Sequence, residues 1–140
     1  EEDEGEAMGT LPPKPVTNLG VTFTMSIAHI TWTYPTTRAD VANTPISSDA
    51  RLTATVYDTA SPTPSVPIGS QGNAPPGGQG FLDYTVVPGS SHGFYVTDSD
   101  GTLISTPTST LTAVAPSAPP KPLLLKNLKK QQEILVNLAQ

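Results

Sequence analysis

The sequence predicts an all-β sandwich followed by a single helix. Only 14% of its 140 residues are charged, against roughly 25% in an average domain, and it contains 16 prolines and 11 glycines. Between residues 15 and 114, apolar and polar residues alternate in several short segments, as half-buried strands require. Residues 123–140 differ in kind, because they contain many leucines and lack glycine and proline. This last stretch therefore predicts a helix.

Residues 1–14 predict an acidic N-terminal arm. They contain five acidic residues and one lysine, lack an apolar period and end at a proline pair. Such a segment is expected to stay extended or disordered until it meets a partner, so residues 1–10 should be mobile. Because the chain begins with Glu1 rather than methionine, we expect a fragment of a longer product or a proteolytically processed chain.

The alternation of apolar and polar residues predicts the first three strands. Leu19 and Val21 indicate the first strand, and residues 28–33 indicate the second, with Trp32 on its apolar face. Trp32 is therefore predicted to lie in the core rather than to form a platform for a sugar. Residues 52–57 give the third strand, which ends on an outward tyrosine.

The middle of the chain predicts a long connection and then two strands. Residues 59–80 contain five prolines and five glycines, which permits at most a short edge strand near residues 66–68 and suggests mobility at 70–80. Alternation returns at residues 82–86 and 92–96, around the turn Pro88-Gly89.

The remaining segments complete the sandwich and then connect it to the C-terminal helix. Asp100-Gly101 predicts another turn, and Leu111 and Ala113 indicate the last strand. The proline-rich residues 116–122 predict a stiff linker.

This order of segments resembles the fibronectin type III family over about residues 15–115. The similarity lies in PVTNLGV, IAHITWTYP with its tryptophan and following proline, and VVPGSSHGFYVTDSDGTLISTP with its P-G step. The resemblance implies an immunoglobulin-like sandwich of about seven strands. His92 stands where the family usually has a tyrosine that pins the corner between the sheets, so the corner bond is either made by imidazole or absent.

One short motif suggests catalysis. Gly89 to Gly93 match G-x-S-x-G around Ser91, the pattern of a hydrolase nucleophile. That motif needs a helix after the serine and a later histidine, whereas here a strand follows. We therefore interpret Ser91 as a turn residue and predict no catalytic residue.

Two patterns suggest a metal site but do not establish one. Asp98, Asp100 and Thr102 alternate around a turn, yet they lack the spacing of a calcium loop, so a plain hairpin is predicted. His29 and His92 fall on opposite strand faces and should not share an ion. No metal or cofactor is predicted.

Charge and hydropathy exclude two classes of partner. The body of the chain has only two arginines, so no basic surface for nucleic acid is expected. No apolar run approaches the roughly 20 residues that span a membrane. Tyr57 and Tyr95 point outward from their strands and are the exposed side chains that we expect to contact a partner.

The C-terminal helix is the strongest functional signal. Its leucines form one apolar stripe, which predicts a docking surface or a short coiled coil with another copy; they are Leu124, Leu125, Leu128, Leu135 and Leu138. The alternative is that the stripe packs on its own sandwich. The proline-rich spacer favours a separate partner.

Together these features predict a structural protein rather than an enzyme. The resemblance implies a non-enzymatic component of a bacteriophage particle, such as a head decoration, fibre or tail protein, located on the virion and attached to other virion proteins. Host-surface glycans are a further candidate partner. The alternative is a spacer or carbohydrate-binding module of a secreted bacterial glycoside hydrolase.

Overall fold

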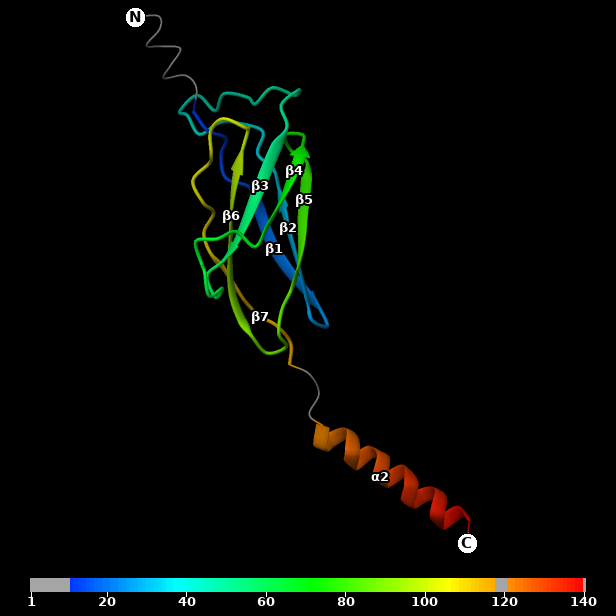
Figure 1. Ribbon diagram of the computed structural model, residues 1–140. Coiled ribbons are helices and arrows are strands. Elements are labelled where there is room, and N and C mark those ends of the chain that lie inside the picture. Colours follow the sequence, from blue (N-terminus) through cyan, green and yellow to red (C-terminus); the bar gives the residue numbers. More distant parts are fainter. Residues whose placement is uncertain (1–10, 118–120, 140) are drawn as a thin grey trace, which may run out of the picture.

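Two antiparallel β-sheets face one another, and a C-terminal helix follows them (Figure 1). The computed structural model describes residues 11–117 and 121–139. Its strands are β1 (Thr17–Thr24), β2 (Ile27–Thr33), β3 (Leu52–Asp58), β4 (Gly69–Ala74), β5 (Gln79–Thr85), β6 (Ser91–Ser99) and β7 (Leu111–Val114). One sheet has the order β1-β2-β5 and the other β4-β3-β6-β7. The predicted sandwich-like, mostly β architecture is confirmed.

The alternation of apolar residues explains which faces meet. Along β2, β3 and β6, every second side chain is buried between the sheets, so each strand contributes one face to a shared core. Trp32 is completely buried, as predicted. Its partner across the β2–β5 ladder is Gly80, where a Cβ would clash with the indole nitrogen. The indole thus packs over bare backbone of β5.

The edge strand of the second sheet differs from the expected position. β4 spans Gly69–Ala74 rather than residues 66–68, and together with β5 it gives regular structure to most of residues 70–80, for which mobility was expected. An edge strand bonds on one side only, so its glycines cost little, and the proline-rich part of the segment remains a loop before it. Just before β4, Ile68 already bonds to β3, because its N–H donates to the Val56 carbonyl at 2.8 Å.

The chain entering β1 is attached to the sandwich. Ala39 donates its N–H to the Pro12 carbonyl at 2.9 Å, Lys14 donates to the Thr37 carbonyl at 3.1 Å, and Pro13 between them is buried. The last residues of the acidic segment therefore run along the loop after β2. Residues 1–10, where mobility was expected, lie outside the described part of the chain.

The helix α2 spans Lys121–Leu138, beginning two residues before the expected start. Pro122 falls in its first turn, where a missing N–H leaves no helical hydrogen bond unmade. Of the expected stiff linker at 116–122, residues 118–120 lie outside the described residues, and the last two residues belong to the helix. Within the described ranges, no helix is both long enough and apolar enough to cross a membrane.

Candidate functional site

Three polar side chains meet at the corner where the chain passes between the sheets. Asp58 is the last residue of β3, His92 is the second residue of β6, and Ser90 directly precedes β6. The tight turn before Ser90 is made by Gly89, whose φ of 84° suits glycine. Because alternate residues of β6 face inward, Ser90 and His92 share the inner face with Asp58. We call Ser90, His92 and Asp58 the corner triad.

Hydrogen bonds join the corner triad into a chain. His92 Nδ1 lies 2.7 Å from Asp58 Oδ2, and His92 Nε2 lies 2.6 Å from Ser90 Oγ. The carboxylate can only accept, so we assign the Nδ1 proton to this bond. The geometry is that of an aspartate, a histidine and a serine linked in sequence, with the serine hydroxyl at its end.

Burial makes this arrangement rigid. The side chain of Asp58 is 1% exposed and that of His92 is 9% exposed. The second carboxylate oxygen of Asp58 accepts the N–H groups of Ala60 at 3.0 Å and Gly93 at 3.2 Å. A buried carboxylate with three donors has no need of water, which holds the imidazole in one orientation.

Aromatic rings complete the surroundings of His92. Phe94 stacks on the imidazole at a centroid distance of 5.5 Å, and Tyr84 of β5 meets it edge-on at 6.2 Å. Burial and the negative charge of Asp58 raise the pKa of Tyr84 above its ordinary value. Tyr84 therefore stays neutral beside the carboxylate over the physiological range.

The Ser90 hydroxyl has two acceptors for one proton. Its Oγ lies 2.5 Å from the Val87 carbonyl as well as 2.6 Å from His92 Nε2. With a neutral imidazole that carries its proton on Nδ1, Nε2 is an acceptor and the hydroxyl donates to it. With a doubly protonated imidazole, Nε2 donates to Oγ and the hydroxyl turns to Val87. The hydroxyl is thus coupled to the proton on His92.

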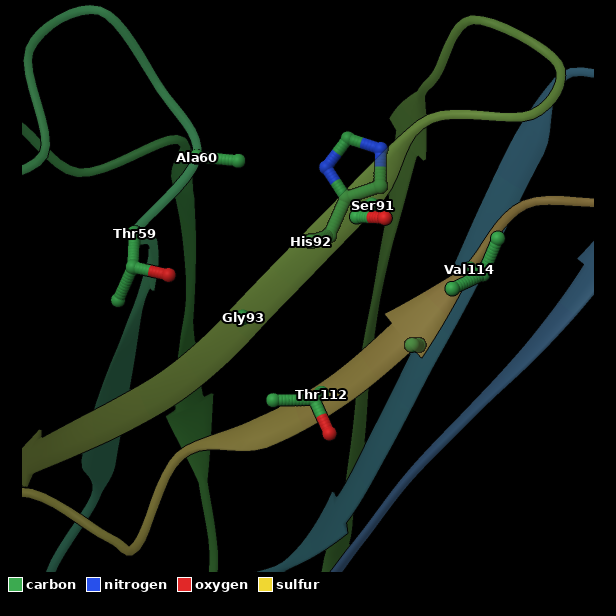
Figure 2. A pocket seen from close by; sticks show the side chains of 8 residues that line it. Thr59, Ala60, Ser91, His92, Gly93, Thr112 and Val114 are labelled. Carbon is green, nitrogen blue, oxygen red and sulfur yellow. The ribbon is translucent and has the colours of Figure 1, made fainter.

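A pocket of about 450 Å³ is lined by His92 of the corner triad, by its neighbours on β6, by β7 and by the segment after β3, but not by Ser90 or Asp58. Figure 2 shows Thr59 and Ala60 on one side of it, His92 and Ser91 of β6 in the middle, and Thr112 and Val114 of β7 on the other side. His92 is the only lining residue with a titratable side chain. The pocket has room for a small organic group.

The sequence motif pointed to the wrong serine. Ser91, at the centre of G-x-S-x-G, is the first residue of β6 and has an exposed side chain, so it is not a turn residue as expected. The serine that contacts histidine is Ser90. The signal that could have found it is the spacing of two between Ser90 and His92, which places both on one face of a strand. Nothing local to the motif indicates Asp58.

The acidic residues near the β6 turn point in different directions. Asp98 faces the core, whereas Asp100 accepts hydrogen bonds from Arg38, Thr102 and Leu103, each at 2.9 Å. The N–H donors and Arg38 together hold the pKa of Asp100 below its usual value despite partial burial. In the described part of the chain, no three potential metal-ligating side chains cluster.

Asp98 is a buried carboxyl group with an unusual titration. Both of its carboxyl oxygens lack a hydrogen-bond partner among the described residues, and burial raises its pKa to about 6 from the ordinary 3.8. The folded state therefore binds the proton more tightly than the unfolded state. The contribution of Asp98 to stability is therefore greatest below pH 4, falls as pH rises toward about 6, and stays reduced above that value.

We expect Asp98→Asn to stabilise the sandwich at pH 7.5, because it removes a buried charge while keeping the shape of the side chain. The expected gain is about 1–3 kcal/mol at pH 7.5 and close to zero at pH 4, where the wild-type group is already protonated. Thermal unfolding at both pH values measures the difference. An equal effect at both would show that the charge of Asp98 is not the cause.

The two candidate contact tyrosines lie side by side on the outer face of the second sheet. Tyr57 of β3 and Tyr95 of β6 are cross-strand neighbours, and their rings stack at a centroid distance of 4.8 Å with an interplanar angle of 5°. Each ring thus covers one face of the other, and both residues are half-buried. The pair presents ring edges and two outer faces to solvent, not one flat platform.

The outer face of the first sheet carries the second histidine. His29 of β2 lies 2.6 Å from the Asp83 carboxylate of β5 and 5.4 Å from the ring of Phe81. His29 thus faces away from the core while His92 faces into it, as expected. The two histidines belong to separate clusters.

The helix α2 exposes its apolar stripe. Leu128, Leu135 and Leu138 are 55%, 65% and 77% exposed, and every described side chain from residue 127 to 139 is exposed. The leucines of the stripe whose side chains are described therefore make no buried contact with the sandwich. The side chains of Leu124 and Leu125 lie outside the described residues.

The sequence matches no protein-family model, and no curated protein is significantly similar to it.

Proposed function

We propose that the chain is a structural attachment protein, which displays its sandwich and binds an assembly through α2. The observation that carries this proposal is the exposed apolar stripe of the helix, represented by Leu128, Leu135 and Leu138. Exposed leucines aligned along one helix face have a large area to bury and no partner on the sandwich. A second helix or a groove on another protein supplies an apolar surface that covers the stripe.

The assembly that we propose is a bacteriophage particle, with the chain as a head decoration, fibre or tail component. The three-plus-four arrangement of antiparallel strands is compatible with the fibronectin type III resemblance of the sequence. A small cysteine-free sandwich on a terminal attachment helix suits display on the outside of a particle. In this reading the sandwich points outward, and Tyr57 and Tyr95 are the first candidates for contact with a cell surface or a glycan.

A second candidate function rests on the first sheet. Phe81 is 49% exposed, and its ring lies beside that of His29, which contacts the Asp83 carboxylate. An exposed ring with neighbouring polar groups is a surface that can hold a sugar, so this face supports the alternative of an accessory module from a secreted glycoside hydrolase. That alternative assigns no role to the leucines of α2.

Mass spectrometry of purified particles tests the proposal. If the protein is a virion component, its peptides should copurify with the particles through a density gradient, in a constant ratio to the major capsid protein. Peptides from a host cytoplasmic protein serve as the control for carry-over. Recovery of the chain only in the soluble fraction, or joined to a catalytic domain in one longer polypeptide, would contradict the virion assignment.

A further inference from the structure

We propose that Ser90 is a nucleophile that the corner triad activates for acyl transfer, giving the sandwich a weak esterase activity. The inference goes beyond the proposed attachment function and is independent of it. It rests on the two hydrogen bonds that join Ser90 Oγ to His92 Nε2 at 2.6 Å and His92 Nδ1 to Asp58 Oδ2 at 2.7 Å. These are the contacts by which a histidine accepts a serine proton while a buried carboxylate orients the ring.

Each member of the corner triad has a distinct role. Ser90 Oγ attacks the carbonyl carbon of an ester as its proton passes to His92 Nε2, and a C–O bond forms. The carbonyl then re-forms, the bond to the leaving alcohol breaks, and His92 returns the proton to that oxygen. Water repeats the sequence on the acyl-serine and releases a carboxylic acid. Asp58 is a positioning residue, because its carboxylate bonds to His92 and to backbone N–H groups and not to Ser90.

The backbone offers a donor for the developing oxyanion. The Ala115 N–H bonds to the Ser90 carbonyl at 2.8 Å, and the Thr59 N–H bonds to the Gly93 carbonyl at 2.8 Å. In an antiparallel ladder, successive residues point their N–H groups to opposite neighbours. The N–H of Ser91 therefore points away from β7, toward the side where β3 has ended and the pocket opens. An N–H directly after the nucleophile is a recurring oxyanion donor.

The pocket that His92 and Ser91 line, though Ser90 itself does not, indicates which acyl group fits. Its volume of about 450 Å³ suits a small group, and its walls of Thr59, Ala60 and Val114 carry no charge. A short, neutral acyl chain is therefore preferred over a charged or bulky one. We expect acetyl and butyryl esters to react, and succinyl esters to react more slowly.

The test uses the full chain with p-nitrophenyl acetate and a fluorophosphonate probe that forms a stable bond with activated serines. We expect release of p-nitrophenol above the rate of the heat-unfolded protein, and labelling with one probe per chain. Ser90→Ala should abolish the labelling and lower the rate at least about 100-fold. Ser91→Ala is the matched control, because it removes the adjacent exposed hydroxyl that the sequence motif marks, and it should leave both signals unchanged.

Two further variants separate chemistry from structure. His92→Gln should abolish labelling, and Asp58→Asn should slow the reaction and alter its dependence on pH, because the imidazole loses its carboxylate partner. Circular dichroism shows which variants fold. Ser90 is only half-buried, so Ser90→Ala should fold even if the others do not. The proposal is overturned if the wild-type chain neither reacts nor labels, if Ser90→Ala keeps its activity, or if Ser91→Ala loses it.

Discussion

Replacing Trp32 with alanine is expected to lower the free energy of unfolding of the sandwich by about 3–5 kcal/mol. Trp32 is completely buried and meets Tyr34 edge-on at a ring centroid distance of 6.2 Å. The residue opposite it on β5 is Gly80, which has no side chain that could move into the space left by the indole. The cavity would therefore persist, and the loss should fall in the upper part of this range. Urea denaturation followed by circular dichroism measures it.

The matched control is Trp32→Phe, which keeps an aromatic ring in the core. The Trp32 indole nitrogen has no hydrogen-bond partner among the described residues, so phenylalanine also removes a buried unpaired donor. We expect a clearly smaller loss than for alanine. A loss below 1 kcal/mol for Trp32→Ala, or rapid quenching of the wild-type fluorescence by iodide, would show that the indole is not the centre of the core.

The sequence predicts the inner faces of the sandwich well because they follow a local rule. Alternation over residues 28–33, 52–57 and 92–96 identifies β2, β3 and β6 and places Trp32 inside, and each of these assignments needs only neighbouring residues. β4 was misplaced because an edge strand rich in glycine has no apolar pattern. Its position depends on pairing with β3, which no local signal in Gly69–Ala74 reveals.

The corner triad could not be predicted for a related reason. His92 and Asp58 are 34 residues apart and meet only because β3 and β6 pair, with Asp58 opposite Phe94. Ser90 and His92 are close in sequence, but the G-x-S-x-G pattern draws attention to Ser91 instead. The resemblance to fibronectin type III domains placed His92 at the corner. The residues that the histidine contacts came only from the structure.

The helix offers a test with an all-or-none outcome. Replacing Leu128 and Leu135 together with alanine should abolish binding of the chain to its assembly, or its association with other copies. The two residues are seven apart, two turns along one face, and both are more than half exposed without a partner. If each contributes about 1.5–3 kcal/mol when buried, their joint loss is enough to eliminate a micromolar contact of about 8 kcal/mol as a measurable complex.

The control is Asn137→Ala, because Asn137 is also exposed but lies about 160–180° around the helix from Leu128 and Leu135. Sedimentation of the free chain and copurification with the assembly give the readouts. The control should bind as the wild type does. The thermal midpoint of the sandwich should be unchanged in both variants, because no described side chain of α2 from residue 127 to 138 is buried.

The two readouts together decide what the helix does. Loss of binding with an unchanged midpoint means that the leucine stripe faces another chain. A midpoint lowered by many degrees with binding retained means that the stripe packs on its own sandwich in solution, and the attachment surface must then be sought in the acidic N-terminal residues or the loops. Equal loss of binding with Asn137→Ala would show that the helix docks through more than one face, as a helix buried in a groove does, and not through the narrow seam of a coiled coil.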